Sequence, residues 1–233
     1  MTVPGHAALT ARTHRLIASR YPTVGIFDDI AATEADLRAA IELESMTNGR
    51  LQAVQQLQRI PPGSVVTGPG GSLIMAAFLH SDPKGGRFSD HRLGAWYAAT
   101  DVDTAIAETI YHNERRLKAS AAGFPNRIQM RELVANLDGS YLDIRGLAGS
   151  HPDLYHPTDY SKSQAFVASL RWPFGEEPGI IYDSVRRAGG TNVCIFHPAA
   201  VGTPVVQADH FEYVWDTKGK LDVMRLTSIS IGR

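Results

Sequence analysis

The stretch KGGRFSDHRLGAWYAATDVDTAIAETIYHNERRL, residues 84–117, contains a Gly-Gly turn, a short strand pattern and a helix pattern in immediate succession. Residues 96–99, WYAA, predict a buried strand. The next four residues, Thr-Asp-Val-Asp at 100–103, resemble a capping box, and acidic groups in a first turn suit the positive end of a helix dipole. A helix is therefore predicted to begin directly after the strand.

This predicted helix carries polar groups on one face. Thr104, Glu108, His112 and Arg115 follow one another at steps of 4, 4 and 3 residues. Such a face ordinarily meets water, and Glu108 can form an ion pair with His112 or Arg115 at this spacing. A carboxylate one or two turns into a helix that follows a buried strand is equally well placed to serve as a pocket acid.

Four side chains suggest nucleotide chemistry when they are considered together. Arg87 offers a rigid fork of donors for phosphate, and Tyr97 offers an aromatic face with a hydroxyl for a heterocycle. Glu108 can accept hydrogen bonds from sugar hydroxyls and offset positive charge, and Ser184 can orient a ribose. This set suits a glycosidic bond that breaks through an oxocarbenium-like state.

Each of these residues also has a purely structural interpretation. Arg87 can cap a turn, Tyr97 can belong to the core, and Ser184 can simply end a strand. Ser184 as a hydrolase nucleophile is a further alternative. Its surrounding sequence, DSVRR, does not match the GxSxG pattern, and no His–Asp pair is evident for it.

Composition limits the possible partners. The chain has 233 residues, of which 43% are hydrophobic, which is enough to bury a large core. A net charge of −1 gives no electrostatic reason to expect direct binding to nucleic acid or to a membrane. The single cysteine, Cys194, excludes an intramolecular disulfide and is expected to be a small buried hydrophobe. Without a long apolar stretch or a signal-peptide pattern, the protein is expected to be cytoplasmic.

Residues 1–60 are predicted to form a helical N-terminal extension of a main domain at residues 61–233. Thr33 to Asp36 resembles a capping box, and Leu51, Val54 and Leu57 suggest a further helix, which the Pro-Pro-Gly sequence at 61–63 ends.

The remaining elements favour an α+β fold, because strands dominate the second half without a regular βα repeat. Asp138-Gly139 predicts a hairpin turn, and Thr158 is a candidate cap for a helix that ends at Trp172. The expected strands are residues 128–137, 141–144, 179–182 and 193–196, followed by a closing hairpin around Lys218-Gly219.

Residues 63–80 predict a strand, a glycine-rich turn and a second apolar element. The GPGG sequence at 68–71 lacks the spacing of a dinucleotide loop and the Lys-Ser/Thr of a P-loop, so a plain turn is favoured over phosphate binding. His80, at the end of this stretch, is a candidate site residue, and a surface position suits it equally well.

Two separated blocks of this chain resemble the RES domain, a family named for its Arg, Glu and Ser. Residues 85–112, GGRFSDHRLGAWYAATDVDTAIAETIYH, are similar to its first half. Residues 179–198, GIIYDSVRRAGGTNVCIFHP, are similar to its second half. Two blocks in the right order are more specific than either motif alone.

The resemblance implies an ADP-ribosyltransferase-like mixed sheet core and a toxin of a toxin–antitoxin pair. Such toxins use NAD⁺ as a substrate, cleave its nicotinamide–ribose bond and pass ADP-ribose to phosphate, water or a protein side chain. It assigns catalysis to Glu108, Arg87 and Ser184, and no metal. The residues expected to bind NAD⁺ are Arg87, Tyr97, His80, Ser184, Arg186 and Asn192.

The chain departs from the family pattern at one point. Many members have an additional first-strand arginine about 20 residues before the position of Arg87, where this chain has Thr67-Gly-Pro-Gly70. The implied partner is a helical, DNA-binding antitoxin that covers the cleft. The alternative is a non-catalytic nucleotide-binding or interaction domain on the same scaffold, because a fold does not determine a function.

Overall fold

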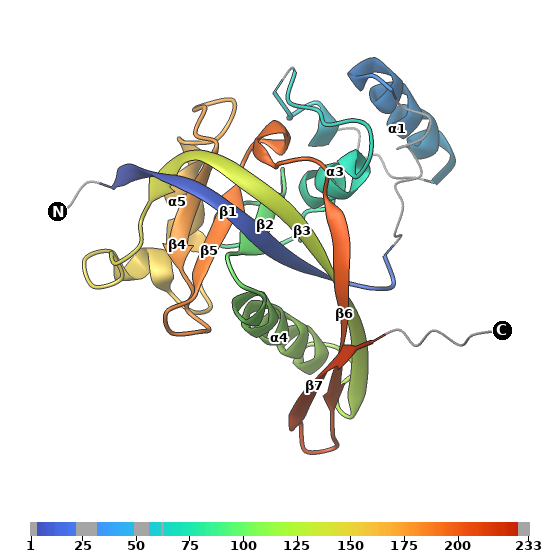
Figure 1. Ribbon diagram of the computed structural model, residues 1–233, viewed down its shortest axis with the longest axis vertical. Helices are drawn as coiled ribbons and strands as arrows, with labels where there is room; N and C mark the ends of the chain where they lie inside the picture. The colour runs from blue at the N-terminus through green and yellow to red at the C-terminus, as the bar shows by residue number, and fades with distance from the viewer. Residues whose placement is uncertain (1–3, 22–31, 49–55, 62, 228–233) are drawn as a thin grey trace.

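A seven-stranded mixed sheet forms the centre of the protein, and helices pack on it (Figure 1). The structure is a computed structural model that describes residues 4–21, 32–48, 56–61 and 63–227. The strand order is β1-β2-β5-β4-β3-β6-β7, with an additional pairing of β1 with β3. The strands are β1 (Gly5–Ala18), β2 (Trp96–Ala99), β3 (Asn126–Asp143), β4 (Gly179–Asp183), β5 (Thr191–Ile195), β6 (Val206–Trp215) and β7 (Leu221–Leu226).

The helices lie between these strands in the sequence, which confirms the α+β class. The α-helices are α1 (Glu34–Asn48), α3 (Gly71–Leu79), α4 (Val102–Lys118) and α5 (Ser161–Ala168), and two 3₁₀ helices are η1 (Pro152–Tyr155) and η2 (Pro198–Ala200). Only β3 and β4 pair in parallel among the named strand pairs of the described chain. None of the helices in the described ranges is long and apolar enough to cross a membrane.

The N-terminal segment differs from the predicted helical extension, because residues 5–18 form a strand of the central sheet. β1 pairs with β3 without a break from Gly5 opposite Asp143 to Ala18 opposite Met130. Thr13 is fully buried, and its hydroxyl donates to the Ala135 carbonyl over 2.9 Å. Short and β-branched residues that alternate between buried and accessible positions favour this extended conformation.

The capping box predicted at Thr33 to Asp36 is confirmed. α1 begins after a capping box, in which the amide of Asp36 donates to the Thr33 hydroxyl and the amide of Thr33 donates to the Asp36 carboxylate. Leu51 and Val54 lie outside the described residues, and Leu57 lies in a helical turn. The domain boundary after residue 60 stays a prediction.

The hairpin predicted at Asp138-Gly139 does not form, since residues 126–143 make one continuous strand. Thr10 and Leu9 of β1 pair with these two residues, and the Thr10 hydroxyl donates to the Asp138 carboxylate over 2.7 Å. Pairing along the whole of β1 therefore outweighs the local turn preference. The hairpin predicted around Lys218-Gly219 is confirmed, as are the two short buried strands.

Two further predictions need adjustment. Residues 63–70 contain no strand, and the GPGG turn instead leads into α3, with Gly70 as its N-cap at a φ of 80°. A Cβ on Gly70 would lie 3.0 Å from the Val205 carbonyl oxygen, so both the conformation and the space favour glycine. The helix predicted from Thr158 to Trp172 is shorter and comprises only α5.

Alternation along the short strands gives the sheet two different faces. Trp96, Ala98, Val193 and Ile195 pack with α3 in one apolar cluster. Their sequence neighbours point to the other face, where Tyr182 and Cys194 lie in a second cluster and Tyr97 packs against it. Burial raises the pKa of the Cys194 thiol to about 12, so it behaves as the expected small hydrophobe.

A test of β1 as part of the core is the substitution Leu16→Ala. Leu16 is 7% exposed and packs with Met130, Phe211 and Trp215 beside α4. We expect the free energy of unfolding, measured with a chemical denaturant, to fall by about 2–5 kcal/mol, because a buried leucine leaves a cavity. The control Arg12→Ala, at an exposed position of the same strand, should change it by less than about 0.5 kcal/mol. Equal free energies of unfolding for Leu16→Ala and Arg12→Ala would mean that β1 does not contribute to the hydrophobic core.

Candidate active site

Asp101 starts the helix that presents Glu108 to the cleft. Its carboxylate accepts hydrogen bonds from the Thr104 amide over 2.8 Å and from the Thr104 hydroxyl over 2.7 Å. The cap is thus Asp101, within the predicted capping sequence but one residue after Thr100. Arg187 pairs with Asp101 over 3.3 Å and donates to the Thr104 hydroxyl over 3.2 Å. These contacts hold the loop after β4 against the start of α4.

Glu108 lies where α4 meets the ends of β4 and β5. Its Oε1 accepts a hydrogen bond from the Ser184 hydroxyl over 2.7 Å and another from the Asn192 amide over 2.7 Å. Ser184 directly follows β4, and Asn192 is a buried residue of β5. The structure therefore brings three predicted site residues together.

The two donors fix one oxygen of this carboxylate. The ion pair of Glu108 with His112 or Arg115, which the helical spacing permits, is absent from the described part of the chain. Within the same ranges Oε2 accepts no hydrogen bond. Glu108 thus has one oxygen held by neutral donors and one oxygen available to a ligand.

The Ser184 hydroxyl is held in turn by the loop that follows it. The amides of Arg186 and Arg187 both donate to Oγ over 3.1 Å, while the hydroxyl proton goes to Glu108. A serine that donates to a carboxylate and accepts two amides is an orienting group, and no histidine bonds to it within the described residues. This geometry gives the hydrolase-nucleophile alternative no support.

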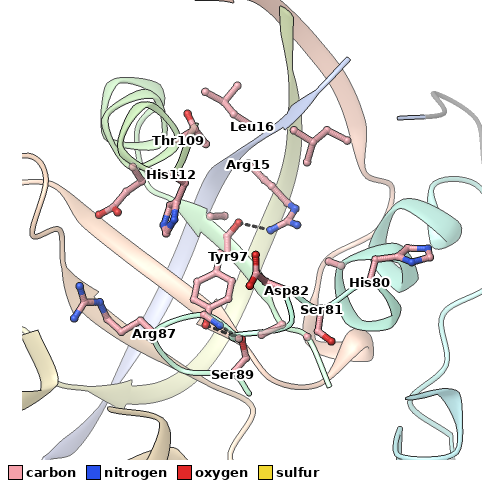
Figure 2. Close-up of a pocket in the computed structure, with 18 of the residues that line it drawn as sticks. Arg15, Leu16, His80, Ser81, Asp82, Arg87, Ser89, Tyr97, Thr109 and His112 are labelled. Atoms are coloured by element: carbon pink, nitrogen blue, oxygen red, sulfur yellow. Dashed lines mark hydrogen bonds between the residues drawn. The ribbon is translucent and has the colours of Figure 1, made fainter. Parts of the chain in front are cut away.

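Tyr97 of β2 lines the same cleft as Glu108 (Figure 2). Its hydroxyl accepts from the Phe88 amide over 2.9 Å and is 3.0 Å from the Ser89 hydroxyl. Burial raises the pKa of the Tyr97 hydroxyl well above 10, so the group stays protonated. Figure 2 shows Thr109 and His112 of α4 on one side of the Tyr97 ring and Arg87 with Ser89 on the other.

Arg87 is buried and already has partners. One nitrogen, Nη1, donates to the carbonyls of Leu154 and His156 over 2.9 Å each. The guanidinium lies 4.8 Å from the centroid of the Tyr160 ring. The interpretation of Arg87 as an anchor for a turn is therefore consistent with these contacts, while Nε and Nη2 donate to no group in the described ranges.

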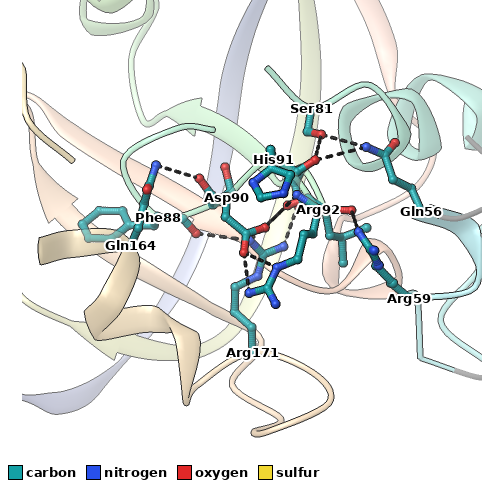
Figure 3. A network of polar contacts seen from close by, with 12 residues as sticks. Gln56, Arg59, Ser81, Phe88, Asp90, His91, Arg92, Gln164 and Arg171 are labelled. Atoms are coloured by element: carbon teal, nitrogen blue, oxygen red, sulfur yellow. Dashed lines mark hydrogen bonds and ion pairs between the residues drawn. The ribbon is translucent and has the colours of Figure 1, made fainter. Parts of the chain in front are cut away.

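The loop that carries Arg87 is held by residues that the sequence did not point to. Gln164 of α5 donates to the carbonyls of Lys84 and Gly86 over 3.0 and 2.9 Å. Arg171 donates to the carbonyl of Gly94 over 2.6 Å (Figure 3). No motif marks a glutamine or an arginine whose partners are backbone carbonyls about 80 residues away.

A cleft of about 1370 Å³ opens over these residues. Among the predicted site residues its lining contains His80, Arg87, Tyr97, Glu108 and Asn192. Ser184 and Arg186 are not part of the lining. The Arg186 guanidinium stacks on Tyr111 at 3.3 Å from the ring centroid and donates to the Pro157 carbonyl.

The two candidates from residues 63–80 lie at the two ends of α3. His80 is exposed and caps the C-terminal end of α3, at the part of the cleft beside Ser81 and Asp82 (Figure 2). The GPGG turn, residues 68–71, does not line the cleft. Among the described residues no group of three or more His, Cys, Asp or Glu side chains could hold a metal ion.

Arg15 is a cleft residue that the sequence analysis missed. It lies on β1, donates to the Tyr97 carbonyl over 3.0 Å and is 5.1 Å from the Trp96 ring centroid. Burial lowers the pKa of its guanidinium to about 10, so it remains charged at neutral pH. The alternating pattern of residues 5–18 is typical of a strand, and this pattern could have indicated that Arg15 lies in the sheet.

The fold and the cleft define an α+β protein in which a helix presents an oriented carboxylate at the ends of two sheet strands. The RES domain family model matches residues 57–216, which is more than half of the 233-residue chain. The chain belongs to the RES domain family.

Two individual proteins are similar over most of the chain. The uncharacterized protein y4oC of Sinorhizobium fredii is 27% identical over 213 residues, which cover 90% of this chain and 85% of the relative. A chain of the crystal structure of the M. tuberculosis MbcT–MbcA toxin–antitoxin complex aligns with a TM-score of 0.47 and 13% identity, covering 88% of this chain and 85% of that chain.

The cap of α4 gives a pH-dependent prediction. Burial acts to raise the pKa of Asp101, but hydrogen bonds from Thr104 and the charge of Arg187 outweigh it, so the pKa is lowered from 3.8. A lowered carboxylate pKa contributes stability above the unfolded value, and this contribution is lost as the pH falls through the folded value. Asp101→Asn keeps a capping oxygen but loses the charge, so we expect it to be about 0.3–1 kcal/mol less stable at pH 7.

The measurement is the free energy of unfolding at pH 7 and at about pH 3, where the gap between wild type and Asp101→Asn should narrow. The control Asp101→Ala removes the cap as well and should stay less stable at both pH values. A gap for Asp101→Asn that does not change with pH would contradict the assigned role of the charge.

Proposed function

We propose that this protein is an enzyme that consumes NAD⁺ by cleaving its nicotinamide–ribose bond. Membership of the RES domain family supports this, because the family resemblance implies NAD⁺ as the substrate. The observation that carries the proposal is Glu108, whose Oε1 is held at 2.7 Å by both Ser184 and Asn192 while Oε2 is available in the cleft.

The proposed reaction needs a fixed negative charge more than a proton donor. When the bond between the ribose C1′ and the nicotinamide nitrogen breaks, its electron pair leaves with the ring, and nicotinamide departs as a neutral molecule. Positive charge then develops on C1′ and the ring oxygen of the ribose. A carboxylate that is already oriented stabilises this charge without reorganisation, which is the main source of electrostatic catalysis. An acceptor atom then bonds to C1′. Water or a protein side chain releases a proton to solvent in this step, whereas phosphate can bond through an oxygen that is already anionic.

The other cleft residues receive supporting roles in this proposal. The Tyr97 ring offers an aromatic surface to the nicotinamide, and Ser184 and Asn192 keep the carboxylate in place. Arg15 and the unbonded edge of Arg87 offer positive charge to the phosphates. Arg15 lies 72 residues before Arg87 (87 − 15), outside the residues that the family model matches, so it does not occupy the position of the additional family arginine. Arg186 would hold the loop after Ser184, and Arg87 would also anchor its own loop. His80 would contact the end of the ligand that is farther from the scissile bond.

The family resemblance extends the proposal to a toxin of a toxin–antitoxin pair, which a helical, DNA-binding antitoxin would inhibit by covering the cleft. ADP-ribose would pass to phosphate, water or a protein side chain. Expression of the protein alone should then arrest bacterial growth and lower cellular NAD⁺, and the antitoxin should relieve both effects. The alternative, a non-catalytic nucleotide-binding or interaction domain, leaves cellular NAD⁺ unchanged.

The central test is Glu108→Gln. This change keeps the shape and an acceptor oxygen but removes the charge, so the rate of NAD⁺ consumption by the purified protein should fall by about two orders of magnitude or more. The measurement is nicotinamide release followed by chromatography.

The matched control is Glu114→Gln on the same helix, where the carboxylate bonds to Lys118 and Trp215 outside the cleft. It should retain activity close to that of the wild type. A folded Glu108→Gln protein as active as Glu114→Gln would remove Glu108 from the mechanism.

A further inference from the structure

The cleft contains two arginines that neither the sequence motifs nor the family pattern assigns. Arg115 and Arg116 of α4 line it and are exposed. Within the described chain neither guanidinium has a hydrogen bond or an ion pair. The other two arginines of the lining, Arg15 and Arg87, each donate to backbone carbonyls. Arg115 and Arg116 are therefore the uncommitted guanidinium groups of this cleft among the described residues.

Helix geometry places Arg115 on the same face of α4 as Glu108. Arg115 follows Glu108 by seven residues (115 − 108). Seven residues are almost two full turns, so the two side chains share one face and are about 10 Å apart along the axis. Side chains of a helix lean toward its N-terminus, and the long Arg115 side chain thus extends back over the preceding turn. Arg116 is the next residue of the helix and also lines the cleft.

His112 lies between Glu108 and Arg115 in the sequence, and the charges of its neighbours affect the pKa of its imidazole. Desolvation lowers the pKa of the His112 imidazole, and the charge of Glu108 opposes the shift. The positive charges of Arg186, Arg115 and Arg116 act in the same direction as the desolvation. The nearest acid of the same helical turn, Glu114, is already bonded to Lys118 over 2.9 Å and to Trp215 over 3.2 Å.

We propose that Arg115 and Arg116 form a subsite for a phosphate group of the dinucleotide on the α4 side of the cleft, in addition to the positive charge that Arg15 and Arg87 offer. This inference rests on the proposed function, since it places the scissile ribose at Glu108 and the phosphates further along α4. One ribose separates the glycosidic bond from the diphosphate, so a ligand that reaches from Glu108 along the helix meets these arginines. Two neighbouring guanidinium groups are better suited to bind phosphate oxygens than any other side chains in this part of the cleft.

A structural role offers a competing explanation. Arg115, Arg116 and Lys118 all lie in the last turn of α4, where basic residues stabilise the negative end of the helix dipole. Lys118 has this position without lining the cleft. It therefore serves as the matched control, because Lys118→Gln alters the charge at the helix end and leaves the cleft intact.

The experiment measures binding by calorimetry with the full chain and three probes: ADP-ribose, nicotinamide riboside and inorganic phosphate. For the double variant Arg115→Gln/Arg116→Gln we expect ADP-ribose binding to weaken by about tenfold or more, as expected for the loss of charge-assisted contacts. Nicotinamide riboside has no phosphate, and its affinity should change by less than about twofold. Weak phosphate binding by the wild type should also disappear in the variant.

Three outcomes overturn the subsite: unchanged ADP-ribose affinity in the double variant, an equal loss for nicotinamide riboside, or the same loss in Lys118→Gln. Inorganic phosphate binding with no effect on ADP-ribose would assign the arginines to a free phosphate and contradict the dinucleotide. A wild type that binds ADP-ribose through these arginines but leaves NAD⁺ intact would refute the proposed reaction and retain the subsite.

Discussion

The hydrogen bonds from Ser184 and Asn192 to Oε1 of Glu108 are the constraint around which the site is arranged. They join three elements that are distant in the sequence: the second turn of α4, the residue after β4 and the first half of β5. A half-buried carboxylate needs such donors, because an unsatisfied charge away from water is costly. Neutral donors satisfy the hydrogen-bonding capacity of the carboxylate and leave its charge in place. An ion pair would neutralise that charge. The carboxylate therefore keeps its full charge for a ligand.

The wall of the cleft opposite α4 is held by reciprocal contacts between the loop at residues 84–94 and the segment at residues 154–171, which contains α5. Gln164 and Arg171 donate to carbonyls of residues 84–94, and Arg87 from that loop donates to the carbonyls of Leu154 and His156. Each segment thus fixes the other, and Tyr97 closes the inner side by accepting the Phe88 amide. Gly86 is required here, since a Cβ would lie 2.5 Å from the Tyr97 hydroxyl. These contacts hold the loop in place as one wall of the cleft.

Local sequence patterns predicted the parts of this structure that local forces determine. The polar spacing of α4, its cap region and the short apolar strands all follow from periodicity and capping chemistry. Long-range pairing decided the rest. β1 contains few large apolar residues, so its pattern was weak, and its pairing with β3 also suppressed the turn expected at Asp138-Gly139. Arg15, Gln164 and Arg171 bond to backbone groups of distant segments, which no single-sequence motif records.

The most direct test of the account is a crystal structure of the Glu108→Gln chain with NAD⁺. We expect this variant to retain the cleft and to turn over NAD⁺ slowly, so that the intact dinucleotide can be observed. We expect the nicotinamide ribose within hydrogen-bonding distance of residue 108, with Ser184 and Asn192 still donating to that side chain. A dinucleotide bound outside the cleft, or one with its adenine end at residue 108, would contradict the central role of this carboxylate.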